Sequence, residues 1–209
     1  MLSKRLASFA AMLLGLGLAA APLIADSDSS TPPPQNGQQD GKQDGDIGPK
    51  TYTQDETLKA AADFFGGTSE GLAKAIEKAF SENGQPTAYI TGNEGSGAII
   101  VGLRYGEGTL YYKNGGSMKV YWQGPSVGWD FGGNASKVFT LVYNLHWTRD
   151  LFQKFPGVDG SLYLVAGVGL NYQRSGDITL APIRTGVGLR AGASIGYLTY
   201  TRSKSWNPF

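Results

Sequence analysis

The stretch that decides the fold runs from Ile183 to Arg202 and reads IRTGVGLRAGASIGYLTYTR. Side chains alternate faces along an extended strand, so even-numbered residues share one face. That face carries four glycines and two arginines: Gly186, Gly188, Gly192 and Gly196 with Arg184 and Arg190. A second segment repeats the pattern, with Gly124, Gly128 and Gly132 on the same face as Asp130. Glycine inside a strand marks tight curvature or the close approach of other groups, so the pattern predicts a narrow, strongly curved interior.

The charges on these two glycine faces are the candidate site. A charge on a buried face is costly unless it is paired and hydrogen-bonded. We therefore expect Asp130 to form a buried ion pair with Arg190 or, failing that, with Arg184. The pair has two possible roles, an internal strut that fixes strand register or a polar anchor for the headgroup of a ligand.

The rest of the chain after Pro86 also shows the period of two that is typical of strands. Candidate strands are 87–91, 98–104, 108–113, 118–123, 127–131, 137–144, 161–174 and 183–202. Turn signals lie at 105–108, 114–116 and 175–177. Many short strands at this spacing predict a mainly β fold, a small soluble antiparallel β-barrel or a strongly curved sheet.

Helical periodicity precedes the strands. Residues 53–65 place apolar side chains on one side and stop at Gly66-Gly67. A second helix begins at Thr68 or Ser69, carries a core-facing stripe, and ends at Asn83-Gly84. One further short helix is expected at 148–155.

The first 50 residues have a different composition. Lys4 and Arg5 precede an apolar stretch, 6–20, that is shorter than the roughly 20 residues a spanning helix needs. We predict a signal peptide over 1–25, a disordered Pro/Gln/Asp-rich tether over 26–50, and a single domain over 51–209. The chain has no cysteine, so it is not a lipoprotein and forms no disulfide. The expected location is the periplasm.

The two parts of the exported chain differ in charge. Residues 26–83 carry 11 acidic and 5 basic side chains, a net charge of −6, whereas residues 84–209 carry 6 acidic and 11 basic ones, a net charge of +5. A basic body favours an anionic lipid or an envelope polymer as partner, although a solvated surface of mixed charge explains the count equally well. We expect peripheral rather than integral membrane contact and no nucleic-acid partner.

Catalytic signals are weak. His146 is the only histidine and no nucleophile elbow accompanies it, so a packing or capping role is favoured. Histidine clusters and cysteine pairs for a metal are missing. Carboxylates for glycosidase chemistry exist (Glu94, Glu107, Asp130 and Asp177), but their spacing brings no two together. We expect a protein that is not an enzyme and uses no cofactor or metal.

Three segments resemble the EipA-like envelope-integrity proteins of Gram-negative bacteria. They are Gly102-Leu-Arg-Tyr-Gly-Glu-Gly108, Tyr121-Trp-Gln-Gly-Pro-Ser-Val-Gly-Trp-Asp-Phe-Gly-Gly133 and Asp177-Ile-Thr-Leu-Ala-Pro-Ile-Arg-Thr-Gly-Val-Gly-Leu-Arg-Ala-Gly192. The resemblance covers roughly 52–209. It implies a small soluble periplasmic β-barrel needed for envelope stress resistance, with a buried Arg–Asp pair in its lumen.

A more distant resemblance links the chain to the SYLF lipid-binding domain. It rests on Tyr105-Gly-Glu-Gly108, Ser126-Val-Gly128, the 137–144 strand and Tyr200-Thr-Arg-Ser-Lys204.

Taken together, the sequence predicts three functions in order of preference: an envelope-integrity protein that binds a lipid or another amphiphile, a ligand-free scaffold bridging envelope components, and a cell-wall glycan enzyme.

Overall fold

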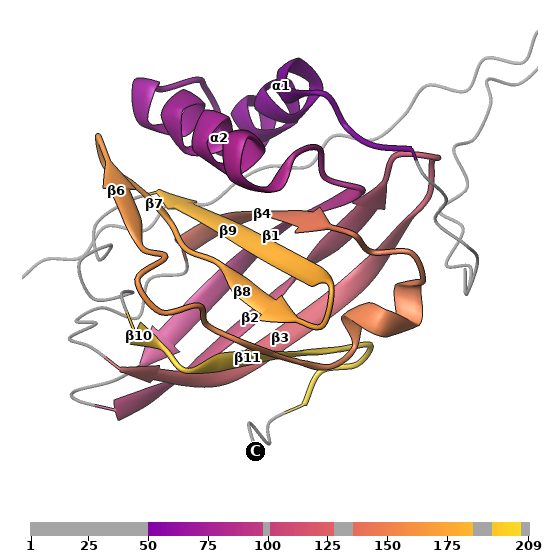
Figure 1. Cartoon of the computed structure of the whole chain (residues 1–209). Helices are drawn as coiled ribbons and strands as arrows, with labels where there is room; N and C mark the ends of the chain where they lie inside the picture. Colours follow the sequence, from indigo (N-terminus) through magenta and orange to yellow (C-terminus); the bar gives the residue numbers. More distant parts are fainter. Residues whose placement is uncertain (1–49, 98–100, 128–135, 186–193, 206–209) are drawn as a thin grey trace, which may run out of the picture. The chain divides into compact units, whose positions relative to one another are not determined.

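The structure is a computed structural model and describes residues 50–97, 101–127, 136–185 and 194–205. It is mainly β: two α-helices precede an antiparallel sheet that curls strongly (Figure 1). The predicted fold class is confirmed. The predicted signal peptide, 1–25, and all but the last residue of the predicted tether, 26–50, lie outside the described residues.

The two N-terminal helices form as predicted, α1 (Gln54–Phe65) and α2 (Glu70–Asn83). A capping box starts α1: the Glu56 amide donates to Thr53 Oγ1, and the Thr53 amide donates to the Glu56 carboxylate. Gly66 ends α1 with φ of 92°, which suits a residue without a side chain. Ser69 caps the start of α2 and Gly84 follows its end.

Eleven strands form the sheet within the described residues. They are β1 (Ala88–Gly97), β2 (Val101–Tyr112), β3 (Ser117–Val127), β4 (Ser136–Tyr143), β5 (Lys154–Pro156), β6 (Tyr163–Val165), β7 (Val168–Leu170), β8 (Gln173–Ser175), β9 (Ile178–Thr185), β10 (Ser194–Ile195) and β11 (Tyr197–Thr201). Their order is β5-β11-β3-β2-β1-β4-β9-β7-β6, with β10 beside β3 and β8 beside β9. A bridge between Gly157 and Gln173 joins the end of β5 to β8, so the two sides of the curled sheet meet.

Several predicted strand boundaries were wrong. The segment 105–108, predicted as a turn, lies inside the continuous strand β2, because Gly106 and Gly108 allow β1 and β3 to pack closely rather than reversing the chain. The segment 161–174, predicted as one strand, forms β6, β7 and β8 instead. The turn signals at 114–116 and 175–177 are confirmed as the β2–β3 and β8–β9 connections.

The short inserted helix is smaller than predicted. Only one 3-10 turn forms, η1 (Thr148–Leu151), and Phe155 belongs to β5. Phe155 is fully buried and pairs with Leu198 of β11. Its burial in the sheet interior outweighs the helical spacing that predicted a helix through residue 155.

Two apolar layers lie on opposite faces of the sheet. The inner layer consists of Ala88, Ile90, Leu110, Tyr112, Val120, Trp122, Val138, Val142, Leu145, Leu151, Phe155, Ile178, Leu180, Leu198 and Tyr200. The outer layer joins the sheet to both helices and consists of Ala61, Leu72, Ala75, Ile76, Ala79, Phe139, Leu141, Tyr143, Val168, Leu170, Tyr172, Ala181 and Ile183. The helices therefore cover the outer face of the β4, β9 and β7 side, as Figure 1 shows.

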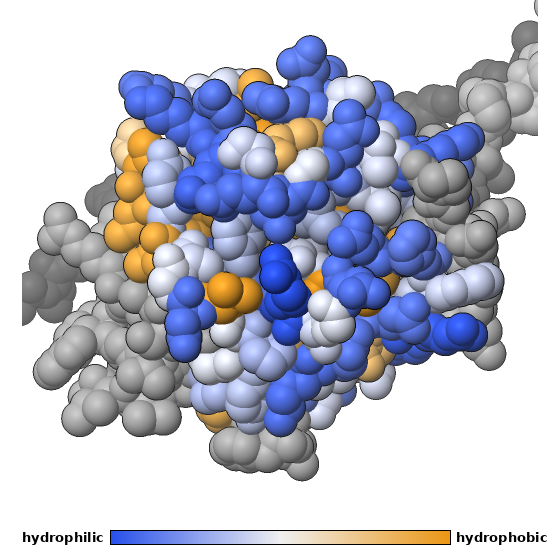
Figure 2. All heavy atoms as spheres, viewed as in Figure 1, coloured by the Kyte–Doolittle hydropathy of each residue, from blue (hydrophilic) through white to orange (hydrophobic). Residues whose placement is uncertain are grey.

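The surface in this view is mostly hydrophilic (Figure 2). An apolar region lies at the β6 edge, where Leu162 and Leu164 are exposed. No helix in the described part of the chain is long and apolar enough to cross a membrane.

Candidate functional site

A buried carboxylate occupies the interior of the curled sheet. Glu94 of β1 faces inward with only 4% of its surface exposed. Arg184 of β9 donates to it through Nε at 2.5 Å and through Nη2 at 3.3 Å, and Nη1 of Arg104 on β2 lies 3.4 Å from Glu94 Oε1. We call Glu94, Arg104, Trp122 and Arg184 the Glu94 cluster.

Glycines make room for the aromatic member of this cluster. Gly106 on β2 lies between Glu94 and Trp122 in the sheet register, and the Trp122 indole lies directly over it. The far end of the same ring lies over Gly92 of β1, where a Cβ would be 2.6 Å from Trp122 Cη2. Because neither glycine has a side chain, the ring lies flat enough for its Nε1 to donate to Glu94 Oε2 at 3.2 Å.

The arginine of β9 has a second partner. Arg184 Nη1 donates to Asn171 Oδ1 at 2.8 Å, which ties the segment between β7 and β8 to the cluster. Arg184 is 9% exposed and Arg104 is 5% exposed, so both guanidinium groups lie in the sheet interior. The cluster thus links four strands through side chains alone.

The electrostatics of the cluster favour the charged carboxylate. Burial by itself raises the pKa of Glu94, but the charges of Arg184 and Arg104 and the hydrogen bonds from Arg184 and Trp122 outweigh it. Together these effects lower the pKa of Glu94 to about 2. Glu94 is therefore ionised at neutral pH and is a poor proton donor.

The predicted site residues have different outcomes. Arg184 is buried and ion-paired, but its partner in the described residues is Glu94. Asp130 and Arg190 lie outside the described residues, so their pairing stays a prediction. The sequence offers Glu94 as a candidate for glycosidase chemistry and carries no signal that it is the partner of an arginine.

A pocket of about 300 Å³ opens beside the cluster. It is lined by Asn93, Glu94, Gly95, Tyr105, Gly106, Glu107, Tyr121, Trp122, Gln123, Lys204 and Ser205. We call it the Trp122 pocket. Its volume lies at the lower end of the range for small-molecule sites, and it combines aromatic walls with a few charged groups.

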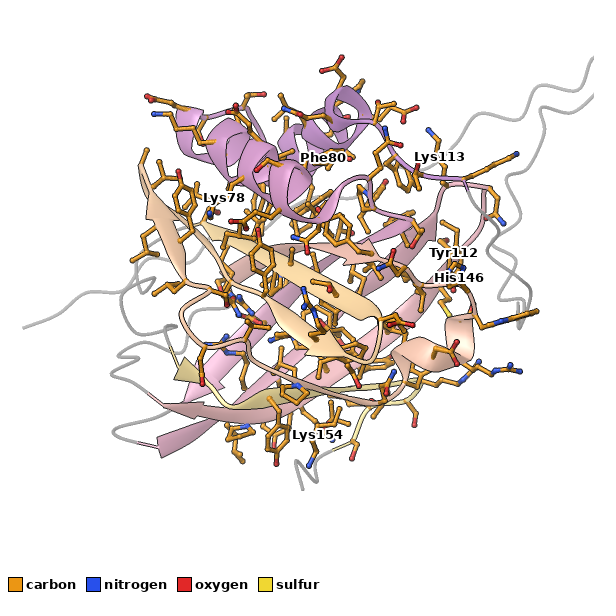
Figure 3. The ribbon with its side chains drawn as sticks, in the orientation of Figure 1. Lys78, Phe80, Tyr112, Lys113, His146 and Lys154 are labelled. Atoms are coloured by element: carbon orange, nitrogen blue, oxygen red, sulfur yellow. The ribbon has the colours of Figure 1, made fainter. Side chains whose placement is uncertain are left out.

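The remaining predicted chemistry lies elsewhere. His146 is exposed in the segment after β4, where Figure 3 labels it. Asp177 lies in the β8–β9 turn. Within the described residues, no group of three His, Cys, Asp or Glu side chains is placed to hold a metal ion.

Comparison with known proteins identifies the family. A crystal structure of a β-barrel-like, uncharacterized protein from Brucella abortus is similar, with 55% identity and a TM-score of 0.71, covering 76% of this chain and 99% of that one. No curated protein matches, and the comparisons show no likeness to the SYLF domain. The family model for envelope integrity protein A matches residues 50–209. The chain therefore belongs to the envelope integrity protein A family, whose name links it to the integrity of the cell envelope.

Proposed function

We propose that the chain is a non-enzymatic periplasmic protein that supports envelope integrity and stress resistance by holding a lipid or another amphiphile in the Trp122 pocket. Family membership supports the link to the envelope. The observation that carries the ligand is the pocket itself, because three aromatic residues, the buried Glu94 and two exposed charged residues line one hollow. Tyr105 and Tyr121, which share a face of the sheet with Glu107, offer apolar contact to a chain or ring, and Glu107 and Lys204 offer polar contact to a headgroup.

The directions in which the Glu94 and Glu107 side chains point favour a non-enzymatic role. Glu94 pairs with Gly106 across β1 and β2, whereas Glu107 pairs with Asn93. The two glutamates therefore point to opposite faces of the sheet, although both line the Trp122 pocket. Glycosidase chemistry needs two carboxylates on either side of one bond, and one of them must hold a proton near neutral pH. The lowered pKa of Glu94 argues against that second requirement.

A ligand-free scaffold is the second candidate, and a specific observation favours it. Both carboxylate oxygens of Glu94 already have partners, since Oε1 meets Arg184 and Arg104 and Oε2 meets Arg184 and Trp122. A carboxylate satisfied in this way can hold strands in register without any ligand. The basic surface of residues 84–209 and the predicted tether would then contact other envelope components.

Native mass spectrometry on protein purified from bacterial membranes and periplasm separates the two candidates. Gly95 lines the Trp122 pocket, and a Cβ added there would meet no atom within 4 Å. A Gly95→Leu side chain should therefore occupy the pocket without disturbing the sheet. The matched control is Gly95→Ala, which adds a single methyl group.

We expect a bound lipid-sized mass on the wild-type protein and on Gly95→Ala, and its loss from Gly95→Leu at an unchanged melting temperature. A wild-type protein that carries no additional mass would instead favour the scaffold. Bound mass that persists on Gly95→Leu would place the amphiphile outside the Trp122 pocket.

A further inference from the structure

The segment that leads into the β6–β7 hairpin presents apolar side chains to solvent. Three of the four large apolar side chains that are exposed in the described residues lie here, namely Val158 (39% exposed), Leu162 (36%) and Leu164 (47%). The fourteen residues from Gly160 to Gln173 carry no charged side chain, which is the longest such stretch after residue 50. Large apolar side chains that gather at one exposed place mark an interaction site.

Both faces of β6 are apolar. In a strand that packs on one side only, buried apolar residues normally alternate with exposed polar ones. Tyr163 packs against the outer apolar layer, and the residues that alternate with it are exposed. These residues are Leu162, Leu164 and Ala166, which we call the β6 patch. β6 is also the last strand in the sheet order, so no described strand covers its outer edge (Figure 1).

The turn of the hairpin keeps its tip apolar at the expense of backbone conformation. Ala166 and Gly167 connect β6 to β7, with φ angles of 43° and 78°. Positive φ at both positions of a two-residue connection is typical of a type I′ turn, in which asparagine or aspartate before glycine is strongly preferred. Alanine adopts the left-handed conformation less readily than asparagine does. The tip therefore has an apolar residue where a polar one would suit the backbone better.

The size and shape of the β6 patch favour a lipid surface over a protein partner. A stable protein–protein interface buries about 800 Å² on each partner. Two partly exposed leucines and one alanine supply only a small part of that area. The patch also lies on a narrow hairpin at the outer limit of the sheet, as Figure 1 shows, rather than on a broad face. A small apolar tip can enter a lipid surface without a matching groove.

An aromatic ring and a lysine lie beside the patch on the side of α2. Lys78 Nζ, labelled in Figure 3, is 5.0 Å from the centroid of the Tyr163 ring. Tyrosine rings and lysine side chains are typical of the headgroup level of a membrane, where an apolar part and a polar end both find suitable surroundings. They would reach that level if the β6 patch entered the bilayer surface.

The charges beside the hairpin select the kind of lipid. Both lysines of α2 are paired, Lys74 with Glu70 and Lys78 with Glu82, each at 2.6 Å. The charged residues of α2, which packs against β6 and β7, and of the turn before β6 are two basic and four acidic, a net formal charge of −2: Lys74, Lys78, Glu70, Glu77, Glu82 and Asp159. This charge repels an anionic surface, whereas a zwitterionic surface has no net charge.

We propose that the β6 patch inserts into the headgroup layer of a zwitterionic phospholipid bilayer and thereby docks the domain on a membrane surface. This contact goes beyond the proposed function and does not depend on the Trp122 pocket. Main-chain groups along the open edge of β6 need water as a partner, so the tip enters the hydrated headgroup layer and not the hydrocarbon core.

Co-flotation with vesicles of phosphatidylcholine and phosphatidylethanolamine tests this contact, using protein purified from the bacterial periplasm. We expect half-maximal binding on the order of 1 mM lipid, weaker than the binding that a single myristoyl chain provides. Because salt does not screen apolar insertion, binding should persist when NaCl is raised from about 0.1 M to about 0.5 M. Gly95→Leu, which alters the Trp122 pocket, should bind the vesicles like the wild type, so this test and the test of that pocket fail independently.

A charge within the patch should abolish docking without unfolding the domain. Leu164→Glu should weaken vesicle binding roughly tenfold or more at an unchanged melting temperature, because the side chain is exposed in the free protein. Trp147→Glu is the matched control. Trp147 is the fourth exposed large apolar residue, at 37%, and lies just before η1, so the same substitution there should leave binding unchanged.

Ala166→Asn separates binding from folding. Asparagine suits the turn better than alanine, so the melting temperature should stay unchanged or rise. Vesicle binding should nevertheless fall roughly threefold, because a polar amide replaces an apolar group at the tip.

A fluorescent label reports the insertion itself. The chain has no cysteine, so Leu164→Cys provides a single attachment point for an environment-sensitive dye such as NBD. We expect its emission to shift to the blue when vesicles are added. A label on Asn114→Cys, at an exposed residue of the β2–β3 turn, should show no shift.

Four results would overturn the proposal. They are no co-flotation at about 10 mM lipid, equal binding by Leu164→Glu and Trp147→Glu, binding that requires phosphatidylglycerol and disappears at about 0.5 M NaCl, and dimerisation that Leu164→Glu abolishes. The third result would assign membrane contact to basic residues elsewhere on the domain, and the fourth would assign the β6 patch to a second copy of the chain.

Discussion

A Glu94→Gln substitution leaves the guanidinium groups of Arg104 and Arg184 buried beside a neutral amide. Removing one partner of a buried ion pair typically costs about 3–5 kcal/mol. We expect a loss of that size in the free energy of unfolding, measured by urea denaturation. Glu107→Gln is the control, because Glu107 is exposed on the opposite face, and it should change stability by less than about 0.5 kcal/mol. Equal effects of the two variants would contradict a structural role for the cluster.

Glu94 should also make the stability of the folded protein depend on pH. The pKa of Glu94 falls from its ordinary value of 4.5 to about 2 on folding, so the unfolded chain binds a proton more readily. The stabilisation is therefore complete above pH 4.5 and is lost as the pH falls from 4.5 towards 2. Denaturation midpoints measured across this range should drop less steeply for Glu94→Gln than for the wild type. Parallel slopes would show that the carboxylate contributes no such stabilisation.

A substitution at Gln173 on β8 is expected to raise the stability of the protein rather than lower it. It is fully buried, and neither Nε2 nor Oε1 of its amide has a hydrogen-bond partner among the described residues. Gln173→Met keeps the length of the side chain and removes the unsatisfied polar atoms. We expect the variant to be more stable by roughly 1–3 kcal/mol, measured by thermal denaturation. A lower melting temperature would indicate that a ligand or water satisfies the amide.

At the level of single residues, strand alternation predicted that Arg184 lies on a buried face, and Arg184 is 9% exposed in the structure. The same alternation could have found Glu94 and Arg104. Gly92 shares a face with Glu94, and Arg104 shares a face with Gly106 and Gly108, which is the same pattern of a charge on a glycine face. Which carboxylate meets which arginine depends on strand order, and sequence alternation does not determine that order.

Among the elements, the packing of α2 against the β6–β7 turn requires a glycine at position 71. A Cβ at Gly71 would lie 2.6 Å from the Val165 carbonyl oxygen and 2.8 Å from that of Ala166, in the β6–β7 turn. Alanine gains about 1 kcal/mol in helix propensity, but the clash with rigid backbone should outweigh it. We expect Gly71→Ala to lower the free energy of unfolding by about 1–3 kcal/mol. Gly95→Ala, whose new methyl group meets no atom within 4 Å, should show no comparable loss.

The sequence predicts helices and strands correctly where local interactions set their ends, and incorrectly where packing against distant segments sets them. Caps and glycine stops located both helices within a residue or two, because these signals act within one turn. The glycines at 105–108 predict a turn, yet they lie inside β2, where Gly106 makes room for the Trp122 ring and Gly108 for the backbone of β1. A glycine that turns the chain and a glycine that admits a neighbour look alike in the sequence, since the neighbour comes from elsewhere.

At the scale of the whole molecule, the helices should be indispensable. They cover the outer apolar layer, in which Phe139, Leu141 and Ile183 are fully buried. A chain that starts at residue 86 would expose this layer to water. We expect it to aggregate or to bind a hydrophobic dye with no cooperative thermal transition, whereas a chain starting at residue 50 should unfold cooperatively. Cooperative unfolding of the shorter chain would mean that the inner layer alone sustains the sheet.

The closure of the sheet has a mechanical consequence. β2 and β3 pair over eleven residues, whereas the main-chain join between β5 and β8 consists of the bridge at Gly157 and Gln173 and a hydrogen bond from the Val158 amide to the Tyr172 carbonyl. Resistance to separation grows with the number of main-chain bonds along an edge. Under tension the β5–β8 seam would therefore part first, opening the interior along its length while the long strands stay joined.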